Sequence, residues 1–179
     1  MKNRMQALRL TLGAICLALC MVLPFVTGQI PQIGSMLCPM HIPVLLCGFI
    51  CGPATAAAVG AAAPVLRFAL FGMPPLFPTG AAMCFELAAY GAACGLLYRM
   101  LPKRRASIYA ALVAAMFIGR VVWGVVSLLL LTASGAGFTF SAFIAGAFVS
   151  AMPGIIVHIM LIPVVVMALE RALPWMKQN

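Results

Sequence analysis

Six long apolar runs, separated by short polar or turn-rich segments, divide the chain. An α-helix needs about 20 mainly apolar residues to cross the hydrocarbon core of a bilayer, and each run is close to that length. The pattern therefore predicts an all-α membrane protein in which six transmembrane helices form one bundle. The predicted spans cover residues 8–26, 33–51, 54–71, 80–101, 106–131 and 141–169.

Proline interrupts two of these runs. Pro39 and Pro43 lie in the outer part of the second run, and Pro153 and Pro163 lie in the sixth. Non-helical backbone is tolerated at membrane depth only where protein or a water-filled cavity satisfies its hydrogen bonds. We therefore expect the second span to begin irregularly.

The composition supports a single integral-membrane domain over residues 1–179. The chain is 65% hydrophobic and 7% charged, with a mean hydropathy of +1.18. No polar stretch is long enough to form a separate water-soluble domain. The basic, apolar start resembles a secretory signal, but the run at 8–26 is long enough to span and no small-x-small cleavage site follows it, so we expect an uncleaved first helix.

Nine of the eleven Lys and Arg residues lie at the start of the chain, at its end, or in one turn between the fourth and fifth runs. These nine are Lys2, Arg4, Arg9, Arg99, Lys103, Arg104, Arg105, Arg171 and Lys177. The outer loops at 27–32, 72–79 and 132–140 contain no charged residue. Lys and Arg are retained on the cytoplasmic side during insertion, so the pattern predicts that both termini are cytoplasmic.

The net charge of +9 also bears on partners. The basic residues flank apolar runs and have no aromatic residues interleaved with them, which favours anionic lipid headgroups over nucleic acid. The seven cysteines fall mostly within apolar runs and lack the C-x-x-C spacing of zinc sites. We expect them to pack as small apolar side chains, with no metal site and no cofactor.

Arg9 and Arg99 lie at the ends of their apolar runs, whereas three charged residues lie deep inside a run, where a charge is costly and usually functional. These three are Arg67, Glu86 and Arg120. Arg67 and Glu86 lie at similar depths in adjacent runs, so a structural ion pair between them is one interpretation. Arg120 then has no acid partner, because the other acid, Glu170, lies beside Arg171 at the cytoplasmic end. One uncompensated guanidinium suits a ligand with one carboxylate.

Other side chains could complete such a pocket. Trp123, Phe117, Gly124 and Ser127 lie on or near the helix face of Arg120, and Tyr90 lies one turn from Glu86. Ordinary helix–helix contacts would explain each of them equally well. His41 lies among the prolines of the second run and is placed for a pocket, whereas His158 is expected to be a lone buried histidine that hydrogen-bonds to backbone.

Four segments of the chain stand out. The first run contains Ala14-x-x-x-Ala18, a spacing that lets another helix approach closely. The others are PMHIPVLLCGFICGP at 39–53, GMPPLFP at 72–78 and FELAAYG at 85–91. Together they resemble the substrate-binding S component of energy-coupling factor (ECF) vitamin transporters. The segment at 72–78 is either a stiff turn on the bilayer surface or a lid over an outward-facing pocket.

This resemblance implies a non-enzymatic subunit in the bacterial plasma membrane that captures a vitamin from outside. It would associate with a transmembrane coupling subunit, through Ala14 and Ala18, and with two ATPase subunits. Its substrate-binding residues would include Arg120, Arg67, Glu86, His41, Trp123 and Tyr90. The motifs look most like pantothenate-type members, and the spare cation favours a monocarboxylate; folate, a queuosine precursor and cobalamin are alternatives.

Two other classes of function are open to a membrane bundle. A stand-alone secondary transporter would need ion-coupling groups on its pathway, for which Glu86 is the sole candidate. An intramembrane hydrolase would need a nucleophile beside an activating base, and the sequence contains no such arrangement. It also contains no glycine-rich phosphate loop followed by lysine, so we expect no catalytic residues and no nucleotide site.

Overall fold

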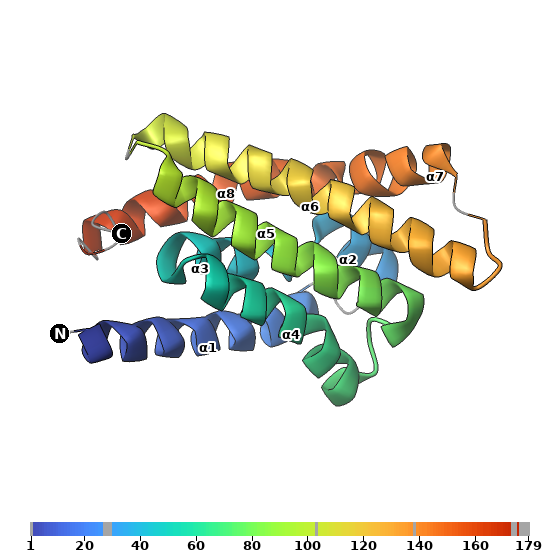
Figure 1. Cartoon of the computed structure of the whole chain (residues 1–179), viewed down its shortest axis with the longest axis horizontal. Coiled ribbons are helices and arrows are strands. Elements are labelled where there is room, and N and C mark those ends of the chain that lie inside the picture. The colour runs from blue at the N-terminus through green and yellow to red at the C-terminus, as the bar shows by residue number, and fades with distance from the viewer. Residues whose placement is uncertain (1, 27–29, 103, 138, 173–174, 176–179) are drawn as a thin grey trace.

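The computed structural model describes residues 2–26, 30–102, 104–137, 139–172 and 175, and within them the chain is a bundle of helices (Figure 1). Lys103 and Lys177 lie outside the described residues. The elements are α1 (Lys2–Val26), α2 (Pro31–Leu37), α3 (His41–Cys51), α4 (Pro53–Phe71), the π-helical turn η1 (Leu76–Gly80), α5 (Ala81–Met100), α6 (Arg105–Ala133), α7 (Phe140–Ile144), the π-helical turn η2 (Ala145–Val149) and α8 (Met152–Ala172).

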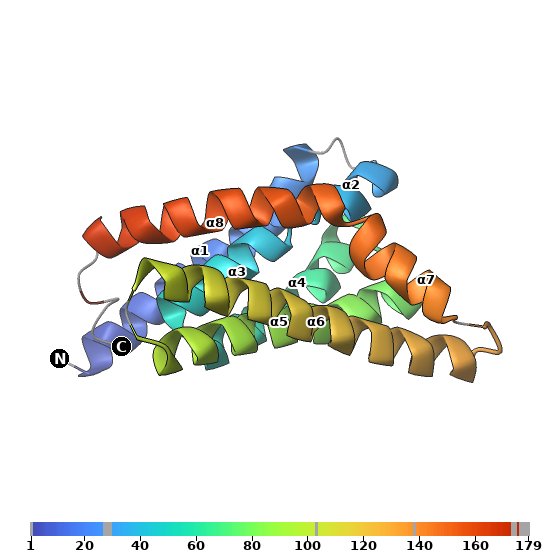
Figure 2. The same ribbon diagram turned by 90° about the horizontal axis from the view of Figure 1, so that it is seen from above.

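Helix α5 is the centre of the bundle, because it packs against α3, α4 and α6. Figure 2 shows α8 along one side of the molecule and α5 with α6 along the other, with α3 between them. Helix α8 contacts α2, α3 and α6. The start of α1, the end of α8 and the turn between α5 and α6 all lie at one end of the bundle (Figure 1).

Glycine allows α4 and α5 to approach closely. A Cβ atom on Gly60 would lie 2.4 Å from the carbonyl oxygen of Leu87, and one on Gly91 would lie 2.6 Å from the carbonyl oxygen of Ala56. Such small residues let two membrane helices pack backbone to backbone. The contact at Leu87 fixes the position of its neighbour Glu86 relative to α4.

Five helical stretches of the described chain are long and apolar enough to cross a membrane. They are Met5–Val26, Pro53–Phe71, Leu76–Met100, Arg105–Ala133 and Phe140–Ala172. They correspond to five of the six predicted spans. The remaining prediction, at 33–51, falls on two shorter helices: α2, and α3 with 11 residues. At 1.5 Å per residue α3 alone is about 16 Å long, roughly half the hydrocarbon core of a bilayer.

The break between α2 and α3 is a sharp turn at Cys38, whose backbone is left-handed with φ of 48°. The backbone N–H of Cys38 donates to the carbonyl of Gly34, which closes the end of α2. This is the irregular start expected from Pro39 and Pro43. As a result, Cys38 and His41 lie next to a cavity and not on one continuous helix.

Candidate functional site

A cavity of about 570 Å³ lies near the end of the bundle opposite the basic clusters. Its walls come from the ends of α1 and α4, the turn before α3, the start of α5, the middle of α6, and η2. The volume falls within the range of about 300–1,000 Å³ that is typical of small-molecule pockets. Met73, Pro74 and Pro75 line it, so the proline-rich segment at 72–78 forms part of the wall.

Five of the six predicted substrate-binding residues line this cavity. They are Arg120, Arg67, Glu86, His41 and Trp123. The sixth, Tyr90, lies behind the wall with 1% of its surface exposed. Its ring packs edge-on against the ring of His41, with 5.0 Å between the centroids, so Tyr90 supports the site from outside the cavity.

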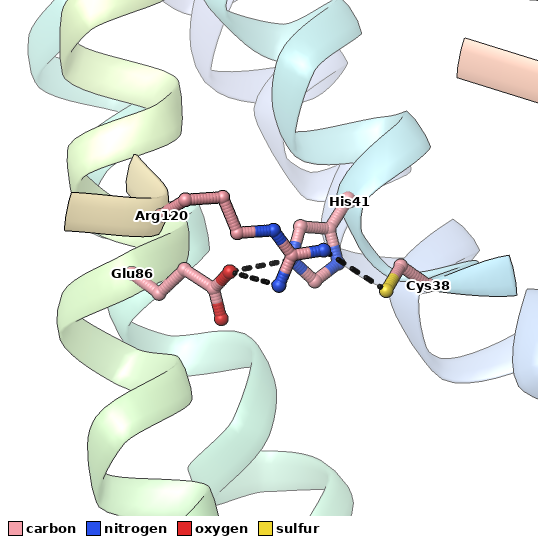
Figure 3. A network of polar contacts seen from close by, with 4 residues as sticks. All are labelled: Cys38, His41, Glu86 and Arg120. Atoms are coloured by element: carbon pink, nitrogen blue, oxygen red, sulfur yellow. Dashed lines mark hydrogen bonds and ion pairs between the residues drawn. The ribbon is translucent and has the colours of Figure 1, made fainter. Parts of the chain in front are cut away.

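Glu86 pairs with Arg120 and not with Arg67. Nη1 of Arg120 donates to Oε1 of Glu86 at 2.8 Å, and Nε2 of His41 lies 3.4 Å from the same oxygen (Figure 3). Nη2 of Arg120 points to the sulfur of Cys38 at 3.5 Å. The interpretation of an Arg67–Glu86 pair was therefore wrong: Arg120 extends from α6 to the face of α5 that carries Glu86.

The contacts of the Arg67 guanidinium are with a backbone carbonyl and aromatic rings and not with an acidic side chain. Its Nη1 donates to the backbone carbonyl of Met21 at 2.7 Å, and its guanidinium carbon lies 5.4 Å and 5.2 Å from the ring centroids of Phe25 and Phe71. The chain has only two acids, and Glu170 accepts a hydrogen bond from the Tyr98 hydroxyl far from this site. Among the described residues that line the cavity, the uncompensated cation is thus Arg67, with 4% of its surface exposed.

A pair of histidines lies beneath the polar wall. The rings of His41 and His158 stack with 6.1 Å between centroids and 20° between planes, so His158 is not an isolated residue. Both side chains are buried. Several buried nitrogen atoms in this part of the described chain make no hydrogen bond: Nδ1 and Nε2 of His41, Nε of Arg120 and Nε2 of His158. Buried polar atoms are normally hydrogen-bonded, so an ordered water or a polar ligand would satisfy these four nitrogens.

Trp123 forms an aromatic wall on the α6 side. Its ring stacks on Phe143 with 6.3 Å between centroids, and a Cβ atom on Gly146 would lie 2.8 Å from it. Glycine at 146 therefore leaves room for the indole ring beside η2. Phe117, expected on the same face as Arg120, instead points outward with 60% of its surface exposed.

Some residues that line the cavity could not be recognised from the sequence. Cys38, Thr79, Met83 and Ser150 also line the cavity. Each is a small, apolar or weakly polar residue inside an apolar run or turn, where nothing distinguishes it from a packing residue. Only the turn between α2 and α3, which carries Cys38, had a signal in the form of its two prolines.

The first helix presents two different faces. Cys16 and Cys20 are buried against the bundle, whereas Ala14 and Ala18 are exposed on the opposite side. The small-x-x-x-small spacing therefore lies on a surface that no described part of this chain covers.

Comparison with protein families gives one match, which covers most of the chain. Residues 8–167 match the family described as "ECF transporter, substrate-specific component". Comparisons with curated proteins and with solved structures give no match.

Proposed function

Because the chain belongs to the family of ECF transporter substrate-specific components, we propose that its cavity binds a vitamin with a single carboxylate, such as pantothenate. A component of this family is a membrane-embedded binding subunit of an importer, and it is not an enzyme. It works with an ECF module and a small-molecule substrate. The choice of substrate is our proposal, and it rests on the guanidinium of Arg67.

The charges of the cavity wall favour one carboxylate. Glu86 neutralises Arg120, so Arg67 is left as a positive charge without an acid partner. A guanidinium in a mostly apolar setting is only weakly screened, and it can bind a carboxylate through two parallel hydrogen bonds. One hydrogen bond to Met21 and two aromatic contacts hold the side chain but leave its charge uncompensated.

The alternatives fit this wall less well. Folate has two carboxylates, and the second would find no unpaired cation among the described lining residues. A queuosine precursor has no carboxylate and would leave Arg67 buried without a counter-charge. Cobalamin is several times larger than pantothenate, so much of it would lie outside a cavity of about 570 Å³.

We also propose that the cavity faces the outside of the cell. The described basic residues Arg9, Arg99, Arg104, Arg105 and Arg171 belong to the end of the bundle opposite the cavity. This distribution supports a cytoplasmic location for that end and for both termini, with α2 and α3 together completing a sixth crossing. An importer takes its substrate from the side on which the cavity then lies.

The exposed alanines of α1 are proposed as the contact with the coupling subunit in the plasma membrane. Replacing both Ala14 and Ala18 with leucine should reduce co-purification with that subunit at least about tenfold, because bulky side chains prevent close helix approach. Ligand affinity should not change, since neither residue lines the cavity. Ala58→Leu, at an exposed position of α4, is the matched control; equal co-purification of all three proteins would contradict the proposal.

The substrate is tested on the full chain purified in lipid nanodiscs. We expect isothermal titration to detect pantothenate binding. Panthenol, in which an alcohol replaces the carboxylate, should bind at least about 100-fold more weakly, as expected when one partner of a buried charge pair is lost. Mass spectrometry of released small molecules is the independent check. Equal affinity for the two compounds, or release of a neutral molecule, would overturn the proposal.

A further inference from the structure

We infer that Glu86 accepts a hydrogen bond from a hydroxyl or amide N–H of the bound molecule, so the substrate is a monocarboxylate with donor groups at its other end. This inference rests on the proposed function, because it concerns the same cavity. It adds a second recognition point on α5, apart from the cation on α4. The two recognition points together determine the orientation of the bound molecule.

The two oxygens of Glu86 have different surroundings. Oε1 receives both the guanidinium of Arg120 and the nearby Nε2 of His41. Within the described part of the chain, Oε2 makes no hydrogen bond and no ion pair. Figure 3 shows this oxygen pointing away from Arg120 and His41. Since Glu86 lines the cavity, Oε2 is the acceptor that it offers to a ligand.

A carboxylate at this buried position needs a hydrogen-bond donor from the ligand. An ionised carboxylate has only acceptor sites, about four in all, and Glu86 is 2% exposed. Leaving such a group without partners costs more than the bond itself would contribute, so an apolar ligand end at this point is disfavoured. The carboxylate of the ligand is disfavoured there as well, because two negative charges would meet.

Neighbouring side chains fix the orientation of the Glu86 carboxylate. Arg120, on α6, donates a hydrogen bond to Oε1, and Nε2 of His41 lies near the same oxygen. The ring of His41 packs against the rings of Tyr90 and His158. These contacts fix the carboxylate so that its free oxygen faces the cavity. The unsatisfied Nε of Arg120 and nitrogens of His41 lie beside it, so this wall is polar, whereas the rest of the cavity is rich in Met and Pro.

The test compares pantothenate with N-(3,3-dimethylbutanoyl)-β-alanine, which has the same carboxylate and amide but neither hydroxyl. Wild-type protein should bind the analogue about 10- to 100-fold more weakly, the usual range for a hydrogen bond to a charged group. In the double variant Glu86→Met/Arg120→Met this preference should fall below about threefold, because the acceptor is gone. The double variant removes both charges, so no buried charge is left unpaired.

Controls separate recognition from damage to the fold. Ser107→Ala removes a buried hydroxyl of α6 that does not line the cavity and should keep the hydroxyl preference. The double variant should still discriminate against panthenol, since Arg67 is intact. Equal binding of both compounds by the wild type overturns the inference alone, as does a preference that persists in the double variant. A wild type that binds neither compound overturns the inference and the proposed function together.

Discussion

Replacing Arg67 with alanine is expected to weaken pantothenate binding by at least about 100-fold, the largest effect of any single change in the cavity. Among the described residues that line the cavity, the substitution removes the one Lys or Arg side chain that no acid neutralises, and the ligand carboxylate would then be buried without a partner. Isothermal titration of the purified chain measures the loss. Panthenol, which has no carboxylate, should bind the variant and the wild type with similar affinity.

Arg67→Lys is the matched control for this prediction. It keeps the charge but loses the two parallel hydrogen bonds, so we expect an intermediate loss of roughly tenfold. Arg67 also ties α4 to α1 through the carbonyl of Met21, so thermal unfolding must be measured alongside binding. An alanine variant that remains folded and binds pantothenate as tightly as the wild type would remove the basis of the proposed substrate.

The long apolar helices and the three charged residues within them could be predicted from the sequence. Both unpaired backbone groups and buried charges have a large energetic cost in a bilayer, so the sequence pattern is informative about them. Long apolar runs must be helical in a bilayer, and the structure has helices at five of the predicted positions. A charge inside such a run is expensive wherever it points. This is why Arg67, Glu86 and Arg120 could be selected without any knowledge of their contacts.

The pairing among these charges could not be predicted, because depth along a helix says nothing about the direction of a side chain around it. Arg67 and Glu86 looked like partners by depth alone. In the structure Arg67 donates to the carbonyl of Met21 on α1 and lies against the rings of Phe25 and Phe71, whereas Arg120 pairs with Glu86. The sequence predicted one intramembrane cation without an acid partner and identified it as Arg120. In the structure this cation is Arg67.

Tyr90 and His158 show the same limit for uncharged contacts. Tyr90 lies one turn from Glu86, but its ring packs onto Gly119 of α6, where a Cβ atom would lie 2.7 Å away, and so it fills the space between helices. His158 contacts His41 only because α8 packs against α3, and these two helices lie far apart in the sequence. Contacts of this kind depend on the assembled bundle.

Replacing Arg120 with alanine is expected to destabilise the protein by about 3–5 kcal/mol, because it leaves Glu86 as an unpaired buried charge. Glu86 is 2% exposed, and its other contact with a basic side chain among the described residues is with His41, whose Nε2 lies 3.4 Å away. Thermal unfolding in nanodiscs, without ligand, measures the effect. Ligand binding should also weaken, since the free oxygen of Glu86 would lose its fixed orientation.

The double variant Glu86→Met/Arg120→Met identifies the cause of this loss. Replacing both members of a buried ion pair with apolar residues of similar size is often neutral, so the double variant should recover most of the stability that Arg120→Ala loses. Arg67→Ala should lower stability less than Arg120→Ala, because it leaves a backbone carbonyl and no charge behind. If Arg120→Ala unfolds at the wild-type temperature, the Glu86–Arg120 ion pair does not stabilise the unliganded protein, and the explanation by an unpaired buried charge is wrong.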